Sequence, residues 1–267
     1  MFLWIFLALL AVAGAVVLWW WVRRRKIAHY YQLPIPVAWA SLLSRRVTLY
    51  DRMPMALKAR LVGHIRYFLD DKVFIGCDGF VVTDEVRLTI AGNACLLVLG
   101  RKGRPFPGFR TIVIYPDAFV APEVVHDGWV VTESNSVRLG ESWHRGPVVL
   151  SWRDVVERGA EGNVILHEFA HKLDEENTGM DGLPVLREAS HYRDWAAVLS
   201  REYERFCHRV QRGEPTLIDP YGAESAAEFF AVISELFFQR PEVMAQEHAA
   251  LYRQLSRLYR LDPAGWS

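Results

Sequence analysis

Two histidines and a glutamate within five consecutive residues are the part of this sequence best suited to chemistry. They stand in the run His167-Glu168-Phe169-Ala170-His171. Residues four apart on a helix project from one face, so His167 and His171 can together hold one Zn²⁺. Glu168 is rotated by about 100° around the helix and is placed to accept a proton from a metal-activated water. The run predicts a zinc-dependent hydrolase with Glu168 as the general base.

The residues around this run predict that it is helical. Asn163 is suited to cap the N-terminus of a helix. An apolar stripe beside the histidines would hold the helix against a core. A chance pairing of two histidines is the alternative, and the separation of a ligand face from a packing face argues against it. The stripe consists of Leu166, Phe169, Ala170 and Leu173.

A catalytic zinc of this type needs a third protein ligand and an open position for water. Metzincins place a third histidine six residues after the second, but this position is Asn177. A predicted helix at 224–238 offers Glu224, Glu228 and Glu235 on one face. A solvated acidic face is the plain alternative, but residues 214–239 contain no lysine or arginine, and a dication would relieve the repulsion among the carboxylates. Spacing alone favours Glu228 or Glu224 over Glu235.

Helices and strands are expected in separate regions of the chain. Helical periodicity predicts helices at 54–69 and 84–99, and from residue 154 onward the pattern is helical apart from a loop at 177–184. The region between them is rich in β-branched residues and turn signals. Strands are expected at 111–115, 129–132, 137–139 and 147–152, with a hairpin turn at 134–136. This order indicates an α+β domain with a small antiparallel sheet and a mostly helical C-terminal half.

The first 22 residues have only apolar side chains and one glycine, Gly14. As a helix they would span about 33 Å, enough to cross a bilayer core. A basic run at 23–26 follows them, which by the positive-inside bias places the rest of the chain in the cytoplasm. A cleaved signal peptide is the alternative, but it needs a basic leader and a shorter apolar core. We expect a transmembrane helix at 1–22, a juxtamembrane linker at 23–48 and a zinc metallopeptidase domain at 49–267, anchored by one span in a membrane of the bacterial inner type.

Composition narrows the remaining function classes. The chain has 31 basic and 31 acidic residues, which argues against a dedicated nucleic-acid-binding protein. Cys77, Cys95 and Cys207 lack the CxxC spacing of a metal or redox motif. In a reducing compartment we expect them to be free thiols.

Several spaced motifs resemble the Mlc titration factor A peptidases. They are His-Glu-Phe-Ala-His-Lys-Leu-Asp at 167–174, Ile-Asp-Pro-Tyr at 218–221 and Ala-Glu-Phe-Phe-Ala-Val-Ile-Ser-Glu at 227–235. Three upstream segments, within 89–97, 113–116 and 146–152, resemble the same family, so the match covers essentially residues 50–262. The catalytic half is also similar to the protease domain of the lethal-factor toxin, which shares the helix with the two histidines and a tyrosine seven residues before the ligand glutamate.

The resemblance implies a zincin-like fold and a role for each site residue. It implies that His167, His171 and Glu228 bind one zinc ion per chain and that Glu168 is the general base. Tyr221 would face the active site, placed to donate a hydrogen bond to the oxyanion of a tetrahedral intermediate. Members of the family have aminopeptidase-like activity on small peptides and bind the glucose-responsive repressor Mlc, which links them to sugar uptake. The anchor at 1–22 lies outside the pattern of the soluble members.

Some roles stay open at this point. Asp174 either orients a ligand histidine or is a helix-end residue, and Glu235 is left as a carboxylate that supports the site or the fold. The strand at 147–152 either aligns a peptide substrate by strand addition or is a structural edge strand.

Two other function classes compete with the peptidase. The first is a membrane-tethered protein that sequesters a cytoplasmic regulator and uses zinc only for its fold. The second is a serine hydrolase, for which Gly140-Glu141-Ser142-Trp143-His144 is the candidate, although it lacks the second glycine of a nucleophile elbow.

Overall fold

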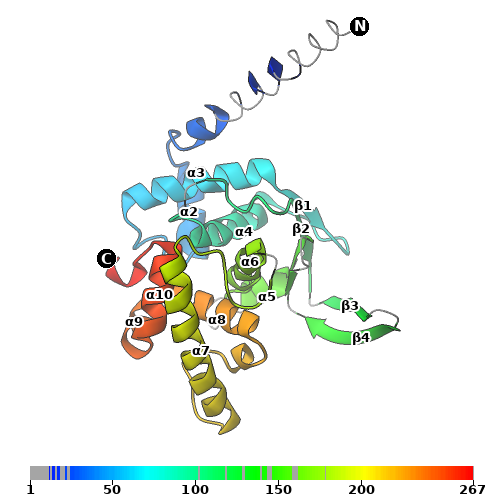
Figure 1. Ribbon diagram of the computed structural model, residues 1–267. Coiled ribbons are helices and arrows are strands. Elements are labelled where there is room, and N and C mark those ends of the chain that lie inside the picture. The colour runs from blue at the N-terminus through cyan, green and yellow to red at the C-terminus, as the bar shows by residue number, and fades with distance from the viewer. Residues whose placement is uncertain are drawn as a thin grey trace, which may run out of the picture.

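The computed structural model describes most of the chain beyond its first 24 residues (Figure 1). The described ranges are 25–101, 103–117, 119–127, 130–138, 140–142, 146–157, 162–177 and 179–266, with isolated positions between 12 and 22. The predicted transmembrane helix at 1–22 therefore lies largely outside the described residues. Within the described part of the chain, no helix combines the length and the apolar character needed to cross a membrane.

A four-stranded sheet of order β1-β2-β6-β5 forms one side of the domain. Strands β1 (Val73–Gly76), β2 (Thr111–Tyr115) and β6 (Val148–Ser151) are parallel, and only β5 (Gly140–Ser142) runs antiparallel to its neighbour β6. The expected antiparallel sheet is therefore wrong for the three main strands. The reason is α4 (Asp84–Leu97), which carries the chain from β1 back to the start of β2, as a parallel pair requires. Strand β1 itself is too short to show a periodic pattern.

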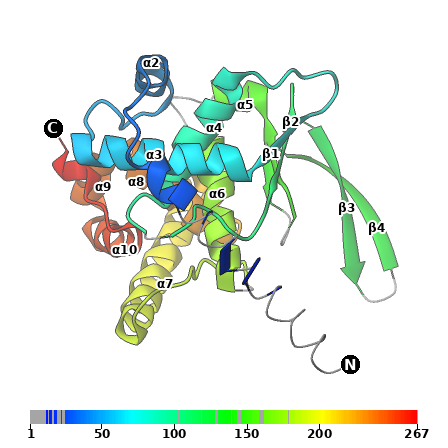
Figure 2. The same cartoon turned by 90° about the horizontal axis from the view of Figure 1, so that it is seen from above.

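A separate antiparallel hairpin consists of β3 (Phe119–Asp127) and β4 (Val130–Arg138). It projects away from the helices, as Figures 1 and 2 show. The hairpin expected around a turn at 134–136 is wrong, because these residues lie inside β4 and pair with 121–123. The last pair of this hairpin is Asp127 with Val130.

Helices make up the rest of the described fold. The expected helices at 54–69 and 84–99 are confirmed as α3 (Met55–Asp71) and α4. The predicted linker at 23–48 differs from expectation, because 37–46 form α2 (Val37–Arg46), whose Leu43 is fully buried against Gly92 of α4. The remaining helices are α5 (Trp152–Glu157), α6 (Val164–Asp174), α7 (Ala189–Gln211), α8 (Ala226–Gln239), α9 (Pro241–Glu247) and α10 (Ala249–Tyr259), with single 3-10 turns at η1 (Glu175–Asn177), η2 (Pro220–Ala223) and η3 (Pro263–Gly265).

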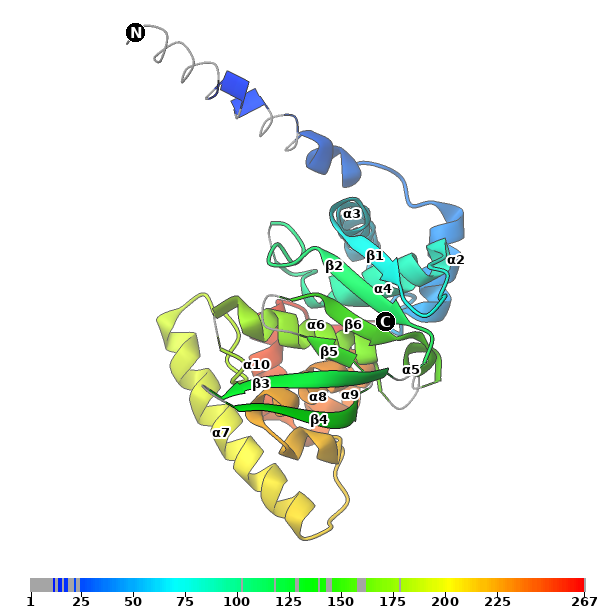
Figure 3. The same cartoon turned by 90° about the vertical axis from the view of Figure 1, so that its right-hand side faces the viewer.

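Helix α6 lies at the centre of the domain, between the sheet and the C-terminal helices (Figure 3). Its apolar stripe is confirmed as core, since Phe169, Ala170 and Leu173 are fully buried. The ring centroid of Phe169 lies 5.0–5.8 Å from those of Phe68, Phe106 and Phe109. Phe68 belongs to α3, and the other two precede β2. Burying one such side chain contributes about 1.5–3 kcal/mol, so this packing fixes α6 firmly.

The three cysteines are free thiols in the structure, as expected. Cys95 is fully buried in α4, and burial raises the pKa of its thiol. None of them lies in a disulfide framework that would constrain the fold.

Candidate metal centre

Asn163 sets the start of the helix that carries both histidines. Its side-chain oxygen accepts a hydrogen bond of 3.0 Å from the backbone N–H of Leu166, so the predicted cap is confirmed. The Asn163 amide nitrogen also donates to Oδ1 of Asn93 on α4, at 2.9 Å. Asn93 in turn donates to the carbonyl of Arg46, at 3.1 Å. This chain of bonds ties the N-terminus of α6 to two other helices.

The helix that carries the glutamates begins two residues later than expected. Ser225 caps α8 by accepting a hydrogen bond of 3.1 Å from the N–H of Glu228. Tyr221 lies in the preceding turn η2, which packs tightly on α8 because a Cβ on Gly222 would lie 2.6 Å from Val232. Glu228 is therefore in the first turn of a capped helix, and Tyr221 is held close to it.

One nitrogen of each histidine and one oxygen of Glu228 converge on a single point. His167 Nε2 lies 2.9 Å from Glu228 Oε2 and 3.2 Å from His171 Nε2. His171 Nε2 lies 3.4 Å from the same oxygen of Glu228. Two ligands bound to a tetrahedral zinc at 2.0–2.1 Å are about 3.3 Å apart, so these donors have the spacing that zinc requires. The donor set of two imidazoles and a carboxylate fits the metal.

The three candidate glutamates have different positions in the structure. Glu228 is the one that meets both histidines. Glu224 precedes α8 and its side chain is exposed to solvent. Glu235 lies two turns after Glu228 on the same face, and its Oε1 is 2.7 Å from Nδ1 of His167.

Glu235 holds His167 from the side opposite to Glu228. Its second oxygen, Oε2, accepts a hydrogen bond of 2.6 Å from the backbone N–H of Asn163. The carboxylate therefore joins α8 to the cap of α6 and fixes the orientation of the His167 ring. Such a partner on the far nitrogen directs the near nitrogen of a histidine toward a metal. In the sequence, the only indication that Glu235 could orient His167 was its position seven residues after Glu228, on the same face of the helix.

Among the described residues, no hydrogen bond joins Asp174 to a ligand histidine, although orienting one was among its two expected roles. Its Oδ2 accepts a hydrogen bond of 2.7 Å from the backbone N–H of Gly182. Nδ1 of His171 has no hydrogen-bond partner among the described residues. Asp174 thus ties the loop after α6 to the end of that helix, and burial raises its pKa to about 6.

The charges of the centre are strongly coupled. Burial opposes the charged form of His167, but the hydrogen bonds to Glu228 and Glu235 outweigh it and raise its pKa to about 10. Burial likewise opposes the charged form of Glu228, yet the two histidines lower its pKa to about 2. Without metal, a proton therefore occupies the position between His167 and Glu228. A metal ion must displace this proton, which makes binding pH-dependent.

Glu168 and Tyr221 differ in their exposure to solvent. Glu168 is only 4% exposed, burial raises its pKa, and its Oε2 has no hydrogen-bond partner among the described residues. The Tyr221 ring centroid lies 5.9 Å from that of His167, and the side chain is 46% exposed. Glu168 is therefore buried, whereas Tyr221 stands at the solvent side of His167.

The backbone at Ser142, the nucleophile of the serine-hydrolase candidate, does not form a nucleophile elbow. Gly140–Ser142 form β5, an edge strand in which Ser142 pairs with Val148. A nucleophile elbow needs a sharp turn from a strand into a helix, and β5 offers none. Trp143 and His144 lie outside the described residues.

The sequence pattern of the glucose-regulated metallo-peptidase M90 family matches residues 18–260. This chain belongs to the M90 family. An uncharacterized protein of Synechocystis sp. is 41% identical over 239 residues, which cover 87% of each chain. Two proteins named Mlc titration factor A are similar as well. The one from Salmonella agona is 34% identical over 78% of this chain and 80% of its own length. The one from Serratia proteamaculans is 33% identical over 76% and 80%, respectively.

Membership in M90 agrees with the donor set on α6 and α8. The family is one of metallopeptidases, so the chain is a metallopeptidase by family and peptides are its substrate class. Its matched region includes both helices of the centre and the whole sheet. The M90 match and the cluster of His167, His171 and Glu228 are independent observations that both indicate a metal-dependent hydrolase.

Proposed function

We propose that this chain is a zinc-dependent peptidase of the aminopeptidase type, with one zinc ion per chain held by His167, His171 and Glu228. The observation that carries the proposal is the convergence of these three donors within 4.8 Å of one another. Structural zinc sites usually have four protein ligands, whereas the described residues supply three. A donor set of two histidines and one glutamate is that of catalytic zinc sites, which favours a peptidase over the alternative of a binding protein with a structural zinc.

Zinc, when bound, supplies a Lewis acid that polarises the scissile carbonyl and makes water a better nucleophile near neutral pH. Glu168 accepts the proton of the attacking water and delivers it to the leaving amine nitrogen. Burial raises the pKa of Glu168, a shift in the direction that suits a group that must both accept and deliver a proton. Glu235 keeps the His167 ring in its binding orientation.

Tyr221 is proposed to donate its hydroxyl hydrogen to the oxygen that gains charge as the carbonyl is attacked. Its place beside His167 on the solvent side of the centre supports this role. One such donor is typically worth about 2.7–4 kcal/mol of transition-state stabilisation.

The cellular setting is proposed from the sequence and the named relatives. Residues 1–22 would anchor the chain by one span in a bacterial inner membrane, with the peptidase domain in the cytoplasm. The proposed partner is a transcriptional repressor of the Mlc type, since two of the similar proteins carry the name Mlc titration factor A. The similarity to the lethal-factor protease domain stays a prediction.

Zinc content and peptide cleavage of the purified full chain test the proposal. We expect one zinc per chain, with both zinc and activity lost in His171→Ala and Glu228→Gln. Glu168→Gln should keep the zinc, and its rate of peptide cleavage should be lower by a factor of about 10²–10⁴. Glu224→Gln, which removes an exposed carboxylate nearby, is the matched control and should change neither. Full activity of Glu168→Gln would reject the mechanism, and full zinc content of Glu228→Gln would reject the ligand set.

A further inference from the structure

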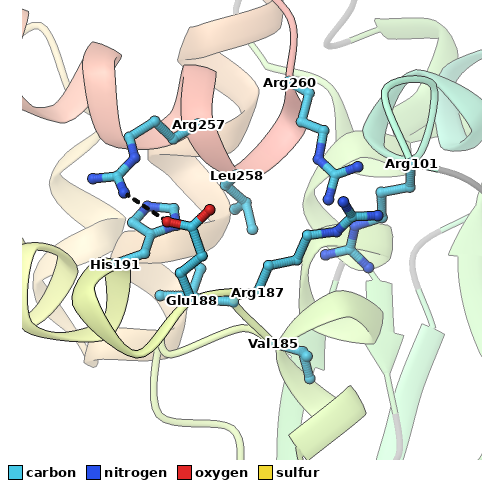
Figure 4. Close-up of a pocket in the computed structure, with 9 residues that line it drawn as sticks. Arg101, Val185, Arg187, Glu188, His191, Arg257, Leu258 and Arg260 are labelled. Atoms are coloured by element: carbon cyan, nitrogen blue, oxygen red, sulfur yellow. Dashed lines mark ion pairs between the residues drawn. The ribbon is translucent and has the colours of Figure 1, made fainter.

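A pocket of about 420 Å³ lies away from the metal centre, and four of the nine residues that line it are arginines (Figure 4). The guanidinium groups come from three parts of the chain. Arg101 follows α4, Arg187 lies in the loop before α7, and Arg257 and Arg260 lie at the end of α10. The volume is within the usual range of small-molecule sites, about 300–1,000 Å³.

The positive charge of the pocket is not balanced by its own lining. Its four arginines face a single acidic lining residue, Glu188, which lies 3.9 Å from Arg257. Arg257 also pairs with Asp194 at 2.9 Å, and Arg101 pairs with Glu176 at 2.7 Å. Among the described residues, no ion pair involves Arg187 or Arg260. Two guanidinium groups of the pocket therefore remain available to an anion.

The guanidinium groups of Arg101, Arg187 and Arg260 point toward one another on one side of the pocket (Figure 4). Partial burial, with Arg187 and Arg101 as neighbours, lowers the pKa of Arg260, although an arginine stays protonated at neutral pH. One terminal nitrogen of Arg101, Nη2, is buried and has no hydrogen-bond partner among the described residues. Like charges gathered in this way destabilise the protein unless a bound anion compensates them.

The fold brings these side chains together through a close backbone contact. A Cβ on Gly100 would lie 1.9 Å from the carbonyl oxygen of Tyr259 and 2.9 Å from Cβ of Arg260. Only glycine permits this approach, which places Arg101 directly beside the end of α10. Arg260 itself has a left-handed backbone, with φ of 54°. The arginines are therefore positioned by the backbone and not only by flexible side chains.

We propose that this pocket binds the phosphate group of a small phosphorylated molecule. Guanidinium groups bind phosphate through paired N–H donors, and several of them can share its three oxygens. A phosphate ester carries about 1.5–2 negative charges at neutral pH, which suits a pocket with four arginines and one acidic lining residue better than a single carboxylate does. A concave pocket of this size favours a small molecule over an extended nucleic-acid backbone.

Calorimetric titration of the zinc-loaded full chain with inorganic phosphate and with glycerol 3-phosphate tests the proposal. Ionic strength is held constant, because salt screens such contacts. We expect saturable binding that weakens about tenfold or more in Arg260→Gln and in Arg187→Gln, since each removes a charged hydrogen-bond donor. Arg253→Gln, on the exposed face of the same helix α10, is the matched control and should bind as the unmodified chain does.

Three results would overturn the proposal. They are no binding at millimolar phosphate, an equal loss of affinity in Arg253→Gln, and tighter binding of citrate than of either phosphate compound. Thermal unfolding of each variant checks that it is folded. None of these measurements depends on peptide cleavage, so the phosphate site and the peptidase activity can fail separately.

Discussion

Oε1 of Glu235 lies 2.7 Å from Nδ1 of His167, on the side of the ring that faces away from Glu228. This contact makes two carboxylates of one helix hold the same imidazole, one at each nitrogen. The metal centre therefore depends on α8 twice, once for a ligand and once for the orientation of a ligand from α6.

The first prediction concerns Glu235. Glu235→Gln should weaken zinc binding by about 10–100-fold. The neutral amide replaces the negatively charged carboxylate that accepts the hydrogen bond from the His167 ring. Competition with a chromogenic chelator measures the dissociation constant. Glu224→Gln should leave it unchanged, since that side chain is exposed. Equal zinc affinity in Glu235→Gln and the unmodified chain would show that this contact does not orient the ligand.

The second prediction concerns Tyr221. Tyr221→Phe should lower kcat by about 10²–10³, while KM and zinc content change little, because the lost hydrogen bond forms only in the transition state. Steady-state kinetics on a small peptide substrate, together with metal analysis, separate these quantities. A change confined to KM would instead assign Tyr221 to substrate binding.

The third prediction concerns stability in acid. His64 of α3 is 2% exposed, its Nδ1 lies 2.9 Å from the Tyr31 hydroxyl, and burial lowers its pKa to about 4. The unfolded chain binds this proton at about pH 6.5, so the contribution of His64 to stability is complete above that pH and is lost as the pH falls toward 4. At pH 5 the loss is about 2 kcal/mol.

Urea unfolding at pH 7.5 and at pH 5 measures this effect. His64→Gln should be less stable at pH 7.5 but should lose less stability between the two pH values than the unmodified chain. His29→Gln, which changes an exposed histidine, should keep the original pH dependence. The assignment fails if His64→Gln and the unmodified chain lose the same amount.

The fourth prediction concerns the contact between α4 and α10. Gly100→Ala should destabilise the protein by about 1–3 kcal/mol, because its Cβ would collide with the carbonyl oxygen of Tyr259. Gly108→Ala is the matched control, since a Cβ there meets no atom within 4 Å. Thermal unfolding measures both. If the two variants have the same Tm, the approach of Gly100 to Tyr259 is not tight.

Local sequence determined the parts of the protein that depend on neighbours along the chain. The helical spacing of His167 and His171 and the cap at Asn163 needed no information from elsewhere. Helices α3 and α4 were predicted within a few residues for the same reason, α3 from its apolar stripe and α4 from its almost uncharged interior.

Tertiary structure decided everything that depends on pairing between distant segments. The parallel direction of β1 and β2 follows from the crossover through α4, and the register of β3 with β4 follows from pairing across the strands. The sequence alone left Glu228 and Glu224 equal as ligands, and the resemblance to a known family was needed to prefer Glu228. The structure separates them because α8 begins at Ala226, which turns Glu228 toward α6 and leaves Glu224 in solvent. The arginine pocket had no signal in the sequence, because its side chains meet only where the ends of α4 and α10 approach at Gly100.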